Sequence, residues 1–233
     1  QPLGPLTPRR ENSSPSYNPP VPPDPKLPFH LHLAEGAKPI ILPSDLPEPY
    51  RLVLLPMYPQ PQFDAAVQAT FRGPTGTVDP ELLGEPDATL LAWRKQRHRQ
   101  LPQIRLAVLC AHEFVGWCFG LSTRVDTFHM ASSAVLEPHR RKGLYTAMAR
   151  ALFQLVRDAG YNALTSHHVA TNNSILIAKL KLGFFIVGVE LDARNGVLLS
   201  MEYPLHEGRR AVLRARSGET LIPAALAEQL CEG

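Results

Sequence analysis

The chain has 233 residues, a formal net charge of +3 at pH 7 and 44% hydrophobic residues, enough to build one sizeable core. The small net charge gives no general argument for binding nucleic acid, and no apolar run approaches the roughly 20 residues that a membrane helix needs. Three cysteines, odd in number and unevenly spaced (Cys110, Cys118 and Cys231), fit a reducing cytoplasm better than a disulfide framework, so we expect a cytoplasmic protein.

Residues 1–49 are predicted to be a proline-rich extended arm or linker. The first 28 residues contain ten prolines, and proline removes the backbone donor that helices and central strands need. Residues 29–33 alternate and are compatible with a short strand. His30 and His32 would share one face of it, but no third ligand lies nearby, so no metal site is expected. The arm is compatible with packing on a second copy in a homodimer, or with acting as a proline-rich recognition ligand.

Apolar spacing predicts a strand, two helices and a two-stranded hairpin in the next part of the chain. In chain order they are 50–57, 63–71, 86–100, 103–111 and 114–121. The helix at 86–100 carries several basic residues. We interpret them as a solvated face or, alternatively, as a surface that meets an anionic ligand.

The second part of the chain alternates strands and helices before a final hairpin. In chain order the elements are strand 127–136, helix 143–159, strand 162–167, helix 172–182, strand 184–191 and strand 197–203. Asn195-Gly196 is a strong signal for the last turn. The tail, 205–233, is basic and is compatible with a short helix at 219–229. It either covers an acceptor site, packs on a partner subunit or extends freely.

The chain is organised around the passage from strand 127–136 to helix 143–159. Pro138 ends the strand because it cannot donate to a ladder. Gly143 lets the backbone approach a ligand, and the first turn of a helix has free N–H groups and about half a positive charge. Three cations lie on the same turn: Arg140, Arg141 and Lys142. The turn therefore suits a pyrophosphate, although an ordinary basic helix start would look similar.

Two motifs resemble one family. Arg140-x-x-Gly143-x-Tyr145 resembles the Q/R-x-x-G-x-G/A loop with which the GCN5-related N-acetyltransferases (GNAT) hold the pyrophosphate of acetyl-CoA, except that Tyr145 replaces a small residue. Residues 172–184 are similar to the family's N-x-x-A-x-x-x-Y-x-x-x-G-F segment, except that Lys179 stands at the tyrosine position and isoleucine at the alanine position. Because both motifs occur in the right order, residues 50–204 are identified as a member of this family.

In the second motif, Asn172 sits where a helix N-cap belongs and Gly183 where a C′ glycine belongs. The resemblance implies an α/β fold with a mixed, twisted sheet of six to seven strands and about four flanking helices. It also implies acetyl-CoA as the cofactor, and direct acetyl transfer to a primary amine of a small molecule or a protein. The implied binding residues are Ser133, Ala134, Val135 and Leu136 along the pantetheine arm, Arg140, Arg141, Lys142, Gly143, Leu144 and Tyr145 around the pyrophosphate, and Asn172.

For the general base, histone-type members of the family place a glutamate on the strand before the loop. The same interval counted back from Arg140 reaches His129. Histidine, with a reference pKa near 6.5, suits proton transfer at neutral pH, although a structural role is the alternative. His167 and His168 end the next strand and are further candidates through a water, and Asp126 is a weaker one.

For the proton that the departing thiolate needs, Lys179 stands where the family has tyrosine. A lysine can protonate or electrostatically stabilise a thiolate, but its reference pKa of about 10.4 makes it a different group from a phenol. It is also compatible with phosphate binding or with a solvated helix position. Tyr145 is a possible substitute, although we expect it on the other side of the phosphate turn.

A second function stays open at this point, which is a regulatory protein of the same fold that binds CoA without catalysis. The substitution of tyrosine by Lys179 favours it, whereas the basic loop and His129 favour the enzyme. No nucleic-acid or membrane partner is expected, because the arginine clusters are short and lack interleaved aromatic residues.

Overall fold

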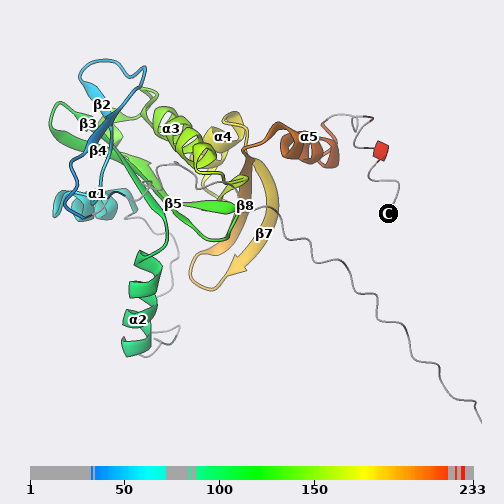
Figure 1. The fold of residues 1–233 in the computed structure, drawn as a ribbon, viewed down its shortest axis with the longest axis horizontal. Coiled ribbons are helices and arrows are strands. Elements are labelled where there is room, and N and C mark those ends of the chain that lie inside the picture. Colours follow the sequence, from blue (N-terminus) through cyan, green and yellow to red (C-terminus); the bar gives the residue numbers. More distant parts are fainter. Residues whose placement is uncertain are drawn as a thin grey trace, which may run out of the picture.

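The computed structural model describes residue 33, residues 35–71, residue 84, residues 88–219 and residues 224, 227 and 228. Eight strands form one sheet in the order β1-β2-β3-β4-β5-β6-β8-β7, with helices on both faces (Figure 1). In chain order the elements are β1 Ile40–Leu42, β2 Tyr50–Leu54, α1 Gln62–Phe71, α2 Ala88–Arg99, β3 Gln103–Cys110, β4 Glu113–Ser122, β5 Thr127–Val135, the 3-10 helix η2 Glu137–His139, α3 Leu144–Asp158, β6 Ala163–Val169, α4 Asn173–Lys181, β7 Phe185–Asp192, β8 Gly196–Pro204 and α5 Glu207–Arg216.

Every element predicted between residues 50 and 203 is present, and the mixed α/β fold is confirmed. Three elements were not predicted: β1, α5 and the short 3-10 helix η2. Strand β1 pairs antiparallel with β2 inside the range expected to be an arm, so the sheet has eight strands rather than six or seven. Helix α5 forms where the sequence indicated only a basic stretch. The strand expected at 29–33 and the helix expected at 219–229 lie mostly outside the described residues.

Two apolar layers enclose the middle of the sheet. On one face, α3 contributes a fully buried stripe that the helical spacing had predicted: Leu144, Met148, Leu152 and Val156. Helix α4 joins the same layer through Leu176. On the opposite face, Phe63 of α1 packs edge-on against Trp117 of β4, with ring centroids 5.6 Å apart. Strands β3 and β4 are therefore covered on both sides, which is why they read as nearly continuous apolar runs.

Arginines of α5 bind this helix to the end of β8. Arg210 donates hydrogen bonds to the carbonyl oxygens of Gly183, at 3.2 Å, and Pro204, at 2.9 Å. Its guanidinium lies 4.5 Å from the ring centroid of Tyr203, and Arg209 pairs with Glu202 at 2.7 Å. The basic stretch of the tail thus uses its charge to hold a helix in place beside β8 (Figure 1). Among the described helices, none is long and apolar enough to cross a membrane.

Strands β5 and β6 are neighbours over only part of their length. Their parallel pairing is limited to three positions, the last of which joins His129 to Thr165. Beyond it, β5 continues to Val135 against β4 alone, and β6 continues to Val169 against β8. The two strands therefore part after His129, and each presents an unpaired backbone edge to the gap between them.

A bulge lies just beyond the point of parting. Gly120 pairs with Met130 but Phe119 pairs with Ser132, which leaves Ala131 without a partner on β4. A Cβ added to Gly120 would lie 2.5 Å from Cε1 of Phe128 and 2.9 Å from the carbonyl oxygen of His129. Glycine at this position allows the close approach of β4 to the bulged strand.

We therefore expect Gly120→Ala to destabilise the protein by about 1–3 kcal/mol, because the new methyl group overpacks the bulge. Urea denaturation measures the loss. Gly188→Ala, on β7, is the matched control, since its added Cβ would meet Ser200 Cβ at an ordinary 3.6 Å. Equal unfolding free energies for the two variants would show that the bulge is not tightly packed.

Candidate active site

The turn before α3 forms an open main-chain cradle. Gly143 is the N-cap of α3 in the left-handed conformation, with φ of 79°, and no side chain caps the helix. The first intrahelical hydrogen bond runs from the Ala147 N–H to the Gly143 carbonyl, so the first three N–H groups of the helix have no partner within it. A Cβ on Gly143 would meet nothing within 4 Å. The cradle can therefore accept an anion at the positive end of the helix dipole.

The cations of the turn are not neutralised by carboxylates. None of the carboxylates in the described ranges forms an ion pair with His139, Arg140, Arg141 or Lys142. Arg140 Nε donates to the carbonyl oxygen of Val135 at 3.0 Å, which ties the turn to the end of β5. The uncompensated charge makes this corner attractive to phosphate groups.

The side chain of Lys142 is directed at β2, and its contact with a pyrophosphate stays a prediction. Its Nζ donates to the Tyr50 hydroxyl at 2.8 Å and lies 5.4 Å from the centroid of the same ring. Nδ1 of His139 lies 3.0 Å from that hydroxyl as well. The Lys142 side chain therefore ties the turn to β2, as Arg140 ties it to the end of β5, and all three cations stay on the turn.

The predicted lining residues of β5 divide between the two faces of the sheet. Val135 packs in the layer under α3, whereas Ala134 and Leu136 pack in the layer under α1. Because strand side chains alternate, the feature that all of these positions share is a backbone edge facing the gap. Leu144 is also buried by its side chain, with 1% exposed, so only its backbone can face a ligand in the cradle.

Asn172 and Gly183 occupy the helix-end positions predicted for them. Oδ1 of Asn172 accepts hydrogen bonds from the Ile175 N–H, at 3.5 Å, and the Ser174 hydroxyl, at 3.0 Å, so it caps α4. Gly183 follows the helix with φ of 93°. The cap accounts for the carbonyl group of Asn172, and its contact with a cofactor stays a prediction.

Lys179 lies fully inside the protein, where three polar side chains meet one sulfur atom. Its Nζ donates to Met130 Sδ at 2.8 Å and lies 4.0 Å from the ring centroid of Phe184. The hydroxyls of Tyr145 and Ser133 each donate to the same sulfur at 3.9 Å. The expectation that Tyr145 lies on the other side of the phosphate turn is therefore wrong, because the first turn of α3 carries it back over β5 to Lys179.

Burial sets the protonation of this cluster. It lowers the pKa of Lys179 to about 7, an effect only partly offset by Cys118. Burial raises the pKa of the Cys118 thiol to about 12, against the opposing effect of Lys179. Burial, and then Cys118, also raise the pKa of Tyr145 well above its usual value. At neutral pH the phenol and the thiol therefore keep their protons, while Lys179 is poised between its two forms.

On the opposite face of β5, two histidines and a carboxylate form a second cluster. Nδ1 of His129 lies 3.0 Å from the Thr165 hydroxyl, and its ring centroid is 5.0 Å from that of His167. Nε2 of His167 lies 3.6 Å from Oε1 of Glu190, which also accepts a hydrogen bond from Ser200. Burial, and then the positive potential of His167 and Lys179, lower the pKa of His129 to about 4. His129 is therefore neutral at neutral pH, but a pKa this far below 7 makes it a weaker proton acceptor than the reference pKa of about 6.5 had predicted.

The rings of His129 and His167 lie against each other, and His168 makes a different contact while still interacting electrostatically with both. His168 contacts Ser166, its ring Nε2 lying 3.2 Å from the Ser166 hydroxyl. Burial, followed by Lys179, lowers its pKa to about 4. No group of three or more metal-ligating side chains occurs among the residues that the structure describes.

Several residues of these clusters carried no sequence signal. Met130, Thr165 and Glu190 belong to the site only because the strand register places them there. Tyr50 reaches the turn from a strand 92 residues earlier than Lys142. Spacing along the chain cannot reveal such contacts, since they depend on which strands become neighbours.

Comparison with known proteins gives one family. The model described as "Acetyltransferase (GNAT) family" matches residues 69–184. Similar solved structures include the IAA acetyltransferase from Bacillus cereus ATCC 14579, with 19% identity, a TM-score of 0.43 and coverage of 57% of this chain and 95% of that one. The yncA protein from Salmonella typhimurium, solved with acetyl-CoA, has 19% identity, a TM-score of 0.45 and coverage of 62% and 85%. The ribosomal-protein-S18-alanine N-acetyltransferase from Escherichia coli has 14% identity, a TM-score of 0.41 and coverage of 52% of this chain and 92% of that one. No curated protein matches the chain.

The burial of Lys179 makes the stability of the protein depend on pH. Its pKa is about 7 in the folded state and about 10.4 in an unfolded chain. Between these values the unfolded state binds more protons, so the free energy of unfolding should rise from pH 7 to pH 10. Lys179→Met removes the buried amine, and we expect it to stabilise the protein at pH 7 by roughly 2–5 kcal/mol and to flatten this rise.

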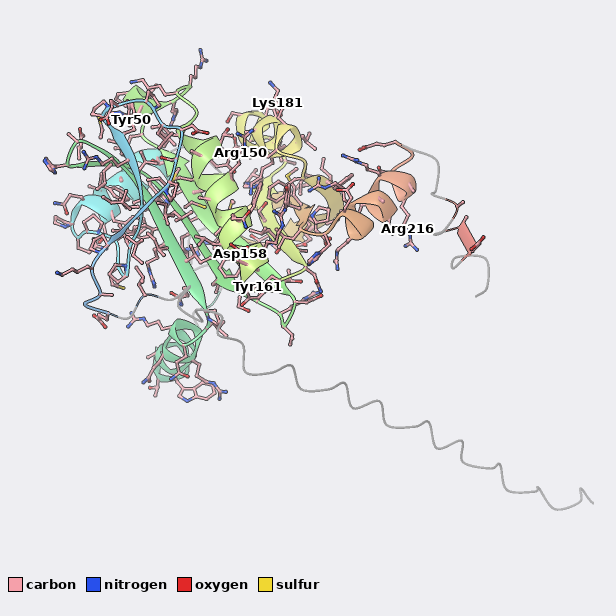
Figure 2. The ribbon with its side chains drawn as sticks, turned by 45° about the horizontal axis from the view of Figure 1, so that its top comes forward. Tyr50, Arg150, Asp158, Tyr161, Lys181 and Arg216 are labelled. Carbon is pink, nitrogen blue, oxygen red and sulfur yellow. The ribbon has the colours of Figure 1, made fainter. Side chains whose placement is uncertain are left out.

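Urea denaturation at several pH values measures both effects. Lys181→Met is the matched control, because Lys181 lies on the same helix but is exposed (Figure 2). It should leave the slope unchanged. A wild-type slope that survives in Lys179→Met would mean that another group causes it.

Proposed function

Because this chain belongs to the acetyltransferase (GNAT) family, with residues 69–184 matching the family model, we propose that it is an acetyl-CoA-dependent N-acetyltransferase. The acceptor is a primary amine of a small molecule or a protein, and the transfer is direct. The observation that carries this proposal is the parting of β5 and β6 after His129, next to the open cradle at Gly143. Residues 50–204 would form the catalytic domain.

The residues present fit acetyl-CoA. The free N–H groups of the first turn of α3 and the cations Arg140, Arg141 and Lys142, which form no ion pair with the described carboxylates, would hold its pyrophosphate. The backbone edge of β5 beyond His129 has hydrogen-bonding groups available for an extended, amide-containing arm. Ser133 to Leu136, whose side chains alternate between faces, would border that arm through their main chain.

Bound acetyl-CoA would supply an acetyl group activated as a thioester. An attacking amine must lose a proton, and His129 is proposed to accept it, because its neutral ring lies where the strands part and beside His167. Its lowered pKa makes it a weak base, so the transfer would depend on passing the proton onward. His167, which is exposed and lies 3.6 Å from Glu190, would pass the proton to solvent. His129 and Met130 are consecutive on β5 and point to opposite faces, so the histidines border the gap on one side and Lys179 on the other.

Lys179 is proposed to give a proton to the departing thiolate. A proton donor works best when its pKa is close to the working pH, and burial lowers the pKa of Lys179 to about 7. In the complete step the amine nitrogen bonds to the acetyl carbon and the carbon–sulfur bond breaks. The proton lost by the amine goes to His129, and the sulfur takes one from Lys179.

A covalent acetyl-enzyme is not part of the proposal. The Cys118 thiol interacts with Lys179, but burial raises its pKa to about 12, which leaves almost no thiolate to act as a nucleophile. We propose a cytoplasmic location on the cysteine content of the sequence alone, which is odd in number and unevenly spaced.

The test of this function is release of free thiol from acetyl-CoA in the presence of an amine panel. The panel contains small primary amines and peptides with a free N-terminus or a lysine. Thiol release that depends on one of these amines, with the acetylated amine found by mass spectrometry, supports the enzyme. Binding of CoA in calorimetry without turnover on any amine would favour the non-catalytic CoA-binding protein, which the lysine at position 179 keeps as the second candidate.

Filling the cradle should abolish cofactor binding. In Gly143→Trp, an indole would occupy the open space in front of the helix, and we expect the affinity for acetyl-CoA in calorimetry to fall at least about 100-fold, since three or more hydrogen bonds to charged groups are lost.

Gly160→Trp is the matched control. Gly160 follows the other end of α3, has φ of 83°, and likewise has nothing within 4 Å of an added Cβ. Both variants should lose about 1–2 kcal/mol of stability from left-handed backbone strain, but only Gly143→Trp should lose affinity. An equal affinity for the two variants would refute the cradle.

The pH dependence of kcat should show two limbs. Below about pH 4 His129 becomes protonated and can no longer accept a proton. Above about pH 7 Lys179 loses the proton that it must donate. We therefore expect kcat to fall on both sides, measured with an acceptor amine of low, known pKa.

Lys179→Tyr separates the two limbs, because a phenol has an ordinary pKa of about 10. This variant should retain turnover, with the alkaline limb moved to higher pH, whereas Lys179→Met should lower kcat about 100-fold.

His129→Ala should lower kcat with little change in acetyl-CoA affinity. A His129→Ala enzyme with unchanged kcat at neutral pH would remove His129 as the base.

A further inference from the structure

Three hydrogen-bond donors gather around Met130 Sδ, and two of them, the Tyr145 and Ser133 hydroxyls, also hydrogen-bond to each other. Lys179 Nζ, Tyr145 OH and Ser133 Oγ approach it from α4, α3 and β5, at 2.8, 3.9 and 3.9 Å. A thioether is only a weak acceptor. Lys179 has no exposed surface, and its ammonium finds no carboxylate partner in the part of the chain described. Such an arrangement is costly unless a better acceptor reaches the cluster.

The place of the cluster indicates what that acceptor is. Met130 follows His129, the last residue of β5 that pairs with β6, so its side chain lies where the gap between the strands begins. The donors converge on a sulfur atom, and a methionine side chain, with three rotatable bonds, can turn aside for another group. A sulfur that carries negative charge would satisfy all three donors far better than a thioether does.

We propose that Tyr145 is a further catalytic residue, whose hydroxyl donates a hydrogen bond to the thiol sulfur of bound CoA, beside Lys179 and Ser133. This inference rests on the proposed function. Tyr145 lies in the first turn of α3, at the position where the family's loop has glycine or alanine. The position on α4 where the family has tyrosine is occupied by Lys179.

Tyr145 and Lys179 would have different roles at the sulfur. Burial raises the pKa of Tyr145 well above its usual value, so its hydroxyl keeps its proton and stabilises the sulfur by hydrogen bonding. When the carbon–sulfur bond breaks, its electron pair stays on sulfur, and the proton that neutralises the sulfur comes from Lys179. Other titratable groups that interact with Lys179 are Cys118 on β4, His129 on β5 and His168 on β6. At neutral pH none of them carries a negative charge.

The test measures the pKa of the CoA thiol in its complex with the protein, from the ultraviolet absorbance of the thiolate during a pH titration. Tyr145→Phe removes only the hydroxyl. We expect it to raise the pKa of the bound thiol by about one to two units, because a hydrogen bond to a charged acceptor is lost. Tyr161→Phe is the matched control, since Tyr161 lies near the opposite end of α3 (Figure 2) and packs on Phe128 with a centroid separation of 5.4 Å.

Binding of CoA is measured by calorimetry on the same samples. If the wild-type protein and Tyr161→Phe bind CoA with a low thiol pKa and Tyr145→Phe raises it, the inference holds. If all three bind CoA and the thiol pKa is the same, Tyr145 only packs against Met130 and the inference fails while the proposed function stands. If the wild-type protein does not bind CoA, both fail together.

Discussion

The loss of pairing between β5 and β6 beyond His129 and Thr165 is the constraint on which the rest of the site depends. Backbone N–H and C=O groups inside a protein need partners, so two facing edges without a ladder form a place for an extended polar ligand. Strand β5 ends at the turn that leads into α3. The same departure of one strand from another therefore creates the gap and directs it toward the open cradle at Gly143.

The alternation of side chains along β5 places the candidate catalytic groups on two faces of the sheet. Consecutive strand residues point to opposite faces, so His129 joins His167 and Glu190 on one face, while Met130 meets Lys179 and Tyr145 on the other. A group held between the strands would have a proton acceptor on one side and sulfur-directed donors on the other. The thickness of one strand separates the two functions, and no single loop carries both.

The buried amine of Lys179 lowers the stability of the folded protein. Taking an ammonium out of water without a counter-ion is expensive, and the contact with the Phe184 ring, at 4.0 Å, offsets only part of it. A leucine or methionine at this position would pack as well and would leave no unsatisfied donor. The retention of such a group where the strands part is understandable if it acts on a ligand there, because functional sites commonly give up stability in this way.

Local patterns in the sequence determined the order of strands and helices, the buried face of α3, the Asn172 cap and the glycine turn before α3, since each depends on residues within a few positions of one another. The same patterns missed β1 and α5, and they misplaced Tyr145. They also could not pair His129 with His167, direct Lys142 to Tyr50 or bring Lys179 to Met130. Those contacts were decided only by the tertiary structure, because strand register and the crossing of α3 and α4 over the sheet join residues that are far apart in the chain.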